Sequence, residues 1–267
     1  MHTEVISNNG IRGAVLTDLH LDRCCVDIDM EEKLIAKLFA TLKKIDYEFI
    51  LILGDIDTAL GVAPSLTLFE HLNKSVYYVL GNHDYYGNFV DDLQTMLAKD
   101  AGLPKRFLYL PGSNVISLSA NTALIGVNAW STLTEEFITS NKLSDTECIK
   151  DFEGLSPKEI SLKLDELNSK ALSCLSANID LATQNHKNIL VSVHIPAFNL
   201  DQSCEAYSSP RLAEIMTEKA KQYPNHTFYI LSGHIHKFQR IKLTDNLFQI
   251  SFDANYFNPT VSGVVEV

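Results

Sequence analysis

The chain has 267 residues, of which 46% are hydrophobic and 21% charged, and its formal net charge is −11. This length suits one α/β domain over residues 1–267 with a substantial core, and the acidic excess argues against a protein that tracks long nucleic acid with a basic face. The first ten residues are polar and no run approaches the roughly 18 to 20 apolar residues of a membrane span, which predicts a cytoplasmic protein without a membrane anchor.

Five short apolar runs, each followed by a polar cluster, indicate buried parallel strands. They cover residues 14–17, 49–53, 76–80, 189–193 and 228–231. Apolar residues at helical spacing follow the first three runs, at 31–45, 64–72 and 89–99. Repeated strand, loop and helix units favour a parallel sheet with helices packed against it.

The middle of the chain has a different pattern. Short β-like runs at 115–118 and 123–127 precede a polar helical region from about 132 to 184. Pro157, with Ser156 before it and Glu159 after it, marks a helix start inside that region. We interpret residues 132–184 as a helical cap inserted into the domain. Three strand patterns, at 238–243, 247–252 and 261–267, then complete the chain.

The five cysteines are odd in number and scattered, and no pair has the C-x-x-C spacing of a zinc or redox site. They are Cys24, Cys25, Cys148, Cys174 and Cys204. We expect reduced thiols outside the functional site, although Cys24 and Cys25 lie a few residues beyond His20.

Polar clusters occupy the ends of the five strand-like runs. They are Asp18-Leu-His20, Gly54-Asp55, Gly81-Asn82-His83-Asp84, His194 and Gly233-His234-Ile-His236. Residues beyond the carboxyl ends of parallel strands gather at one edge of a sheet, so clusters far apart in sequence can lie together. Carboxylate, imidazole and amide ligands suit divalent ions such as Mn, Fe or Zn, and Asp55 on its tight turn is the candidate bridge between two ions.

These clusters resemble the pattern of the calcineurin-like metallophosphoesterases, which runs D-x-H, G-D, G-N-H-D/E, H and G-H-x-H. Every element is present in that order between Asp18 and His236. The resemblance is to small stand-alone phosphoesterases of prokaryotic type. It implies a four-layer α/β/β/α sandwich, with the strand-rich C-terminal half forming the second sheet.

The resemblance also implies roles for individual residues. The first of two divalent or trivalent ions takes Asp18, His20, Asp55 and His236, and the second takes Asp55, Asn82, His194 and His234. A hydroxide that bridges the ions attacks phosphorus in line, and His83 as imidazolium protonates the leaving oxygen. Asp84 is expected to orient the imidazole of His83.

This sequence departs from the motifs of individual branches of the family, and these differences narrow the range of expected substrates. No Asp-Arg-Gly follows Asp55 and the G-N-H is followed by Asp84, so a protein phosphatase is disfavoured. A histidine at position 83 disfavours the lipid-precursor pyrophosphatases, which resemble these enzymes but carry arginine there. The favoured substrate is a small phosphodiester or phosphomonoester such as a nucleotide. A nuclease and a scaffold of the same fold without catalysis are the alternatives, and the oligomeric state stays open.

Several residues near the motifs have two open interpretations. Asp22 and Asp57 either support the ligands or cap turns. Tyr85 and Tyr86 either line the substrate pocket or pack the loop that follows His83. Asn128 and Trp130 follow a strand pattern in a segment that lies near the site in many family members, while core packing is the other interpretation of the tryptophan.

Overall fold

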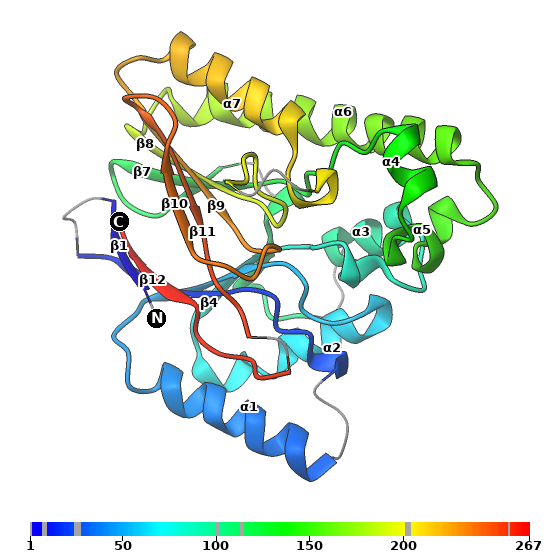
Figure 1. The fold of residues 1–267 in the computed structure, drawn as a ribbon. Helices are drawn as coiled ribbons and strands as arrows, with labels where there is room; N and C mark the ends of the chain where they lie inside the picture. The colour runs from blue at the N-terminus through cyan, green and yellow to red at the C-terminus, as the bar shows by residue number, and fades with distance from the viewer. Residues whose placement is uncertain are drawn as a thin grey trace.

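The apolar runs assemble into two sheets of six strands that pack face to face, with helices over both outer faces (Figure 1). A computed structural model describes residues 2–6, 10–23, 28–99, 102–112, 115–200, 204–255 and 257–267. Cys24 and Cys25 lie outside these residues. The predicted α/β class and the four-layer sandwich are confirmed.

The first sheet contains the three apolar runs from the N-terminal part of the chain. Its order is β1 (His2–Val5), β12 (Gly263–Glu266), β2 (Arg12–Leu16), β3 (Phe49–Leu53), β4 (Ser75–Val79) and β5 (Phe107–Tyr109). β2, β3, β4 and β5 are parallel neighbours, whereas β12 runs antiparallel to β2. The carboxyl ends of β2, β3 and β4 therefore meet at one edge, as the sequence predicts.

The second sheet comes from the C-terminal half. Its order is β10 (Gln239–Lys242), β11 (Leu247–Ser251), β9 (Thr227–Ser232), β8 (Asn188–Ser192), β7 (Thr122–Gly126) and β6 (Ile116–Ser117). The strands β7, β8, β9 and β11 are parallel neighbours, and β6 and β10 pair antiparallel at the edges. Thus the last two predicted runs, β8 and β9, are central strands of this sheet.

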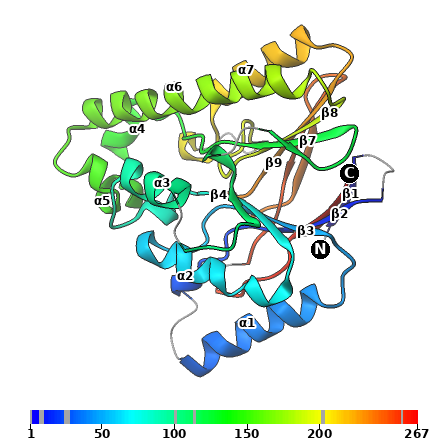
Figure 2. The same ribbon diagram turned by 180° about the vertical axis from the view of Figure 1, so that it is seen from behind.

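Three layers of apolar side chains hold the sandwich together. Leu51 of β3 and Leu190 of β8 are fully buried between the two sheets. The helices α1 (Ile28–Leu42), α2 (Val62–Thr67) and α3 (Val90–Lys99) lie on the side of the first sheet, and α7 (Pro210–Gln222) covers the second (Figure 2). Burial of apolar surface at about 25 cal/mol per Å² makes these layers the main source of stability.

The predicted helical region contains α4 (Glu135–Ser140), α5 (Ser144–Cys148) and α6 (Pro157–Ala182). The start of α6 is as predicted, because the Ser156 side chain accepts the backbone N–H of Glu159 while the Glu159 carboxylate accepts that of Ser156. The second half of α6 lies beside α7 and buries Leu172, Leu175 and Ile179 against the second sheet. The single domain and the insertion at 132–184 remain predictions.

Three elements of the structure, β1, β5 and α7, were not predicted from the sequence. β1 pairs in parallel with β12, near the other end of the chain, and its residues alternate between half-buried and exposed. α7 begins at Pro210 and buries Leu212, Met216 and Ala220 at helical spacing, a signal that was present in the sequence. None of the helices within the described residues is long and apolar enough to cross a membrane.

Candidate metal centre

All seven predicted ligands lie where strands end, and both sheets contribute. Asp18 and His20 follow β2, Asp55 follows β3 and Asn82 follows β4, while His194 follows β8, and His234 and His236 follow β9. Parallel strands bring these ends to one edge of the sandwich, as in other open α/β sheets. The candidate site therefore spans the two sheets.

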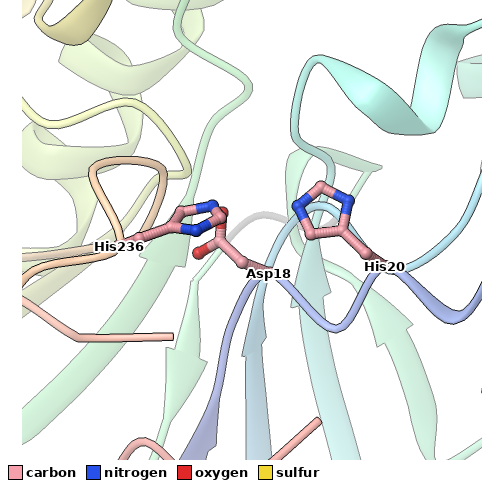
Figure 3. A group of neighbouring side chains, drawn as sticks. All are labelled: Asp18, His20 and His236. Atoms are coloured by element: carbon pink, nitrogen blue, oxygen red, sulfur yellow. The ribbon is translucent and has the colours of Figure 1, made fainter. Parts of the chain in front are cut away.

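The side chains converge into three overlapping groups. Within each group, the potential ligand atoms all lie within 4.8 Å of one another. The groups are Asp18, His20 and His236; Asp55, His194 and His234; and His20, Asp55 and His83. Figure 3 shows the first group, with the Asp18 carboxylate between the two imidazoles. The first group contains the ligands predicted for the first metal except the shared Asp55. The second group contains the ligands predicted for the second metal except Asn82.

Asp55 occupies the position expected of a bridge. Its Oδ2 atom lies 3.5 Å from Nε2 of His20 and 3.3 Å from Nε2 of His194. Its other oxygen accepts the backbone N–H of His83 at 2.9 Å, which restrains the carboxylate. One buried oxygen thus faces a ligand of each predicted metal position.

Backbone carbonyls orient two of the imidazoles. His194 donates from Nδ1 to the carbonyl of Leu53 at 2.7 Å, and His234 donates from Nε2 to the carbonyl of Ala206 at 3.0 Å. Each ring then presents its other nitrogen to the cluster, and these two nitrogens lie 3.2 Å apart. Such bonds to the outer nitrogen fix the tautomer that a metal-binding histidine needs.

Asn82 provides a test of whether a metal fits this site. Its Nδ2 atom donates to Oδ1 of Asp145 at 2.8 Å, while its own Oδ1 is buried and has no hydrogen-bond partner. A buried acceptor without a partner costs roughly 1 to 3 kcal/mol, which a bound cation would offset. Together with the Asp and His side chains, this amide oxygen makes a donor set suited to two divalent ions.

The backbone at the ligands is strained. Asp18, His20, Asp55, His234 and His236 have φ between 43° and 69°, and they are five of the eight residues other than glycine with positive φ in the described parts of the chain. Each such conformation costs on the order of 1 to 3 kcal/mol and persists only where neighbours hold it. Here the N–H groups of Asp18 and His20 bond to the carbonyls of Gly54 and Asp55.

Gly54 and Gly81 allow these turns to approach one another. Gly54 has a φ of 88°, and a Cβ atom there would lie 2.5 Å from the backbone nitrogen of Gly81. A Cβ atom on Gly81 would collide with Oδ1 of Asp55. The glycines of the two motifs are therefore needed for the close packing of the turns that carry Asp55 and Asn82.

Buried opposite charges shift the acidities of the cluster. Burial disfavours the ionised forms of Asp18 and Asp55, but His194 and other imidazoles beside them hold the pKa of both carboxyls below the ordinary value. Burial likewise opposes the charge on His194, yet Asp55 and Asp18 raise its pKa to about 10. The metal-free cluster therefore keeps a proton on His194 at neutral pH.

Metal uptake at pH 7 is expected to release about one proton from His194, because a metal needs the lone pair that this proton occupies. The raised pKa of about 10 means that the release persists through neutral pH and declines as the pH rises through that value. Calorimetric titration with Mn²⁺ in buffers of different ionisation enthalpy measures it. Uptake at pH 7 without proton release would contradict this assignment.

Asp84 does not orient His83, contrary to our expectation. The Asp84 side chain is fully buried, and its two oxygens accept the backbone N–H groups of Asp55, Ile56, Asp57 and Gly81. Burial and the Asp55 carboxylate raise its pKa, while the N–H donors favour the carboxylate. Asp84 therefore holds the Gly54-Asp55 turn against the Gly81-Asn82 turn, and does not face the cleft.

His83 has a different partner. Nη2 of Arg23 lies 3.2 Å from Nδ1 of the His83 imidazole. A guanidinium can only donate, so Nδ1 is the acceptor and Nε2 carries the proton. Burial and Arg23 lower the pKa of His83 although Asp55 opposes them, which favours the neutral imidazole over the expected imidazolium. The Nε2–H group can still donate a hydrogen bond.

The structure decides between the interpretations of several neighbouring residues. Tyr85 and Trp130 are buried, and their rings pack 5.1 Å apart. Asn128 joins this packing by accepting the backbone N–H of Leu80 and donating to the Tyr85 hydroxyl. By contrast, Tyr86 lines the cleft over the metal cluster. Of the nearby residues with open interpretations, Tyr86 is thus the one on the cleft wall.

The side-chain hydrogen bonds and ion pairs described for Asp57 and Asp22 are with residues other than the predicted metal ligands. The Asp57 carboxylate accepts the backbone N–H of Thr58 and the hydroxyl of Ser65, as in a turn cap. Asp22 lies 3.8 Å from the Arg23 guanidinium. The capping interpretation therefore holds for Asp57.

A cleft of about 440 Å³ opens over the metal cluster. Besides metal ligands and His83, its walls include Tyr86, Lys142, Ser144, Asp145 and Tyr207. The last four were missed, because they lie in segments that match no motif and no strand pattern. Only the helical content of the region 132–184 indicated that part of this wall comes from there.

Comparisons with known proteins agree with this geometry. The family model for calcineurin-like phosphoesterases matches residues 11–238. A search of curated protein sequences finds no significant match. A dimetal phosphatase from Danio rerio superimposes with a TM-score of 0.60 at 12% identity, covering 92% of this chain and 88% of that protein.

Two further solved structures share the fold. Phosphopantetheinyl hydrolase from Mycobacterium tuberculosis has a TM-score of 0.55 at 15% identity, with 92% of this chain and 91% of that chain covered. GAP50, the anchor in the inner membrane complex of Plasmodium, has a TM-score of 0.52 at 18% identity, with 90% and 70% covered. Identities this low show a shared fold and leave substrate and partners open.

Proposed function

The chain belongs to the calcineurin-like phosphoesterase family, and we propose that it hydrolyses small phosphate esters with two metal ions held by Asp18, His20, Asp55, Asn82, His194, His234 and His236. The observation that carries the proposal is the position of Asp55, whose Oδ2 faces His20 on one side and His194 on the other. A single metal would leave one of these groups unused.

The metals would supply Lewis acidity toward water and toward the phosphoryl oxygens. The protein residues contribute position and a hydrogen-bond donor. Asp55 holds the two ligand groups together, and Asp84 fixes the two turns that carry Asp55 and Asn82. His83 lies on the cleft wall with its Nδ1 engaged by Arg23, so Nε2–H is the group available to the departing oxygen.

The shape of the cleft supports a small substrate. At about 440 Å³ it has the volume of an ordinary small-molecule site, and its walls include Tyr207 and the α5 residues Ser144 and Asp145. The net charge of −11 also disfavours a long polyanion. We therefore propose a small phosphodiester or phosphomonoester, such as a nucleotide, as substrate. Manganese, iron or zinc is the proposed metal, and the cytoplasm the proposed compartment.

The first experiment is metal analysis of the purified protein, followed by assays with p-nitrophenyl phosphate, bis-p-nitrophenyl phosphate and cyclic nucleotides in added Mn²⁺. We expect about two metals per chain and hydrolysis of at least one ester that stops in chelator. Preferred cleavage of DNA ends would instead support a nuclease. Inertness toward every ester with both metals bound would support the scaffold alternative.

A further inference from the structure

Asp145 lies in the helix α5, within the predicted insertion, and contacts the predicted metal ligand Asn82. Its Oδ1 atom accepts two hydrogen bonds, from Nδ2 of Asn82 at 2.8 Å and from the hydroxyl of Tyr86 at 2.6 Å. The residue follows Asn82 by 63 positions and belongs to none of the family motifs. Its contact with a predicted metal ligand therefore requires an explanation.

A carboxylate at this position determines which way the Asn82 amide faces. A carboxylate only accepts hydrogen bonds, so the amide must turn its NH₂ group toward Asp145. The carbonyl oxygen of Asn82 then points the opposite way, where it is buried without a hydrogen-bond partner. Asp145 thus selects the orientation in which the amide can bind a metal, and excludes the one in which NH₂ would face it.

Asp145 is itself held firmly against the segment that follows Asn82. The N–H of Gly87 donates to the carbonyl of Cys148 at 2.7 Å, and the N–H of Lys150 donates to the carbonyl of Asn88 at 3.2 Å. Ile149 and Phe152, just after α5, are buried in the core. The helix that carries Asp145 cannot shift without moving the loop beyond Asn82.

The second hydrogen bond to Asp145 comes from Tyr86, and it connects Asp145 to the wall of the cleft beside His83. Tyr86 gives its hydroxyl to the same oxygen of Asp145, and its ring lies over the His83 imidazole with the centroids 4.4 Å apart. One carboxylate oxygen therefore joins a predicted metal ligand to the aromatic wall beside His83. Bonds of this kind behind a metal ligand are typically worth 10- to 100-fold in metal affinity.

We propose that Asp145 is a positioning residue for the second metal, orienting the Asn82 amide oxygen toward it from the inserted helical segment. This inference rests on the proposed function, because it takes Asn82 to be a metal ligand. It assigns to the insertion a part in building the metal site, in addition to forming the wall of the cleft. The two hydrogen bonds described for Asp145 come from Asn82 and Tyr86, neither of which is a predicted ligand of the first metal.

Calorimetric titration of the full chain with Mn²⁺ tests the proposal without relying on activity. Asp145→Ala is expected to weaken the second Mn²⁺ by about 10- to 100-fold and to leave the first near its wild-type affinity. Asp145→Asn keeps an oxygen acceptor in place and should lose much less. Glu147→Gln, on the same helix but paired with the exposed Lys142, is the matched control and should titrate like the wild type.

An exchange of the two side chains separates positioning from a general effect on folding. Asn82→Asp alone places two carboxylates in contact and should weaken the second metal. Adding Asp145→Asn restores a hydrogen bond with the donor and acceptor exchanged, so the double variant should bind the second Mn²⁺ more tightly than either Asn82→Asp or Asp145→Ala. A residue that only stabilises the helix would show no such recovery.

Two results overturn the inference. One is a second Mn²⁺ affinity in Asp145→Ala equal to the wild type, and the other is a double variant no better than Asn82→Asp. Both results are compared with a wild-type protein that binds two metals. If the wild-type chain itself binds none, the proposed function fails, and that failure is visible before any variant is made.

Discussion

Asp55→Ala is expected to lose the second metal and weaken the first, and to lower kcat/KM by about 10³- to 10⁴-fold. The reason is that Oδ2 of Asp55 faces ligands of both predicted metal positions, so its removal opens the two sites together. A loss of roughly 4 to 5 kcal/mol of transition-state stabilisation, within the range that metal ions supply, corresponds to that factor. Metal analysis and kinetics on the same preparation measure both effects.

The matched control is Asp46→Ala. Asp46 is an exposed carboxylate that precedes β3, whereas Asp55 follows the same strand, so the variant removes the same group from the opposite end. It should keep metal content and turnover. If the Asp55→Ala protein still binds two metals, the assignment of Asp55 as the bridge is wrong.

His83→Ala is expected to keep its metals but to lose about 10²- to 10³-fold in kcat, the usual cost of removing a hydrogen-bond donor aimed at charge that develops in the transition state. The loss should be largest for an ester with a poor leaving group and small for a p-nitrophenyl ester, whose departing oxygen carries its charge without such a hydrogen bond. His83 can act in this way because Arg23 engages Nδ1 and leaves Nε2–H toward the cleft. Steady-state kinetics on an alkyl and an aryl ester compare the two cases.

His71→Ala is the control for this variant, because His71 is an exposed histidine outside every motif. Its variant should match the wild type with both esters. Equal turnover of the alkyl ester by His83→Ala and the wild type would remove His83 from the mechanism. A loss of metal in His83→Ala would show instead that the residue belongs to the metal site.

The sheet edge with its ligands could be predicted because the physics of a parallel sheet is visible in the sequence. Strands buried on both faces are nearly continuous apolar runs, and the polar clusters of this chain follow where such runs end. β3, for example, is fully apolar and is followed at once by Gly54 and Asp55. The family pattern then provided the roles that spacing alone leaves open.

The role of Asp84 could not be predicted, because neighbours in sequence do not have neighbouring side chains in a tight turn. Residues His83–Tyr85 form one turn of 3-10 helix, which sends the Asp84 side chain into the interior while His83 stays at the cleft. Asp145 was missed for a related reason. Its contact with Asn82 depends on how a helical segment packs, and no periodicity in the sequence specifies that packing.

The division of the ligands between the two sheets affects the durability of the protein as well as its chemistry. Asp18 and His20 come from one sheet and His236 from the other, and the second group is shared in the same way between Asp55 and His194. Each ion held there would therefore cross-link the two sheets, in addition to the apolar contacts and the few hydrogen bonds, such as that of His194 to the Leu53 carbonyl, that already join them. A ligand at 100 times its dissociation constant stabilises a fold by about 2.7 kcal/mol. Metal scarcity would thus shorten the lifetime of the folded chain at the same time as it removes the activity.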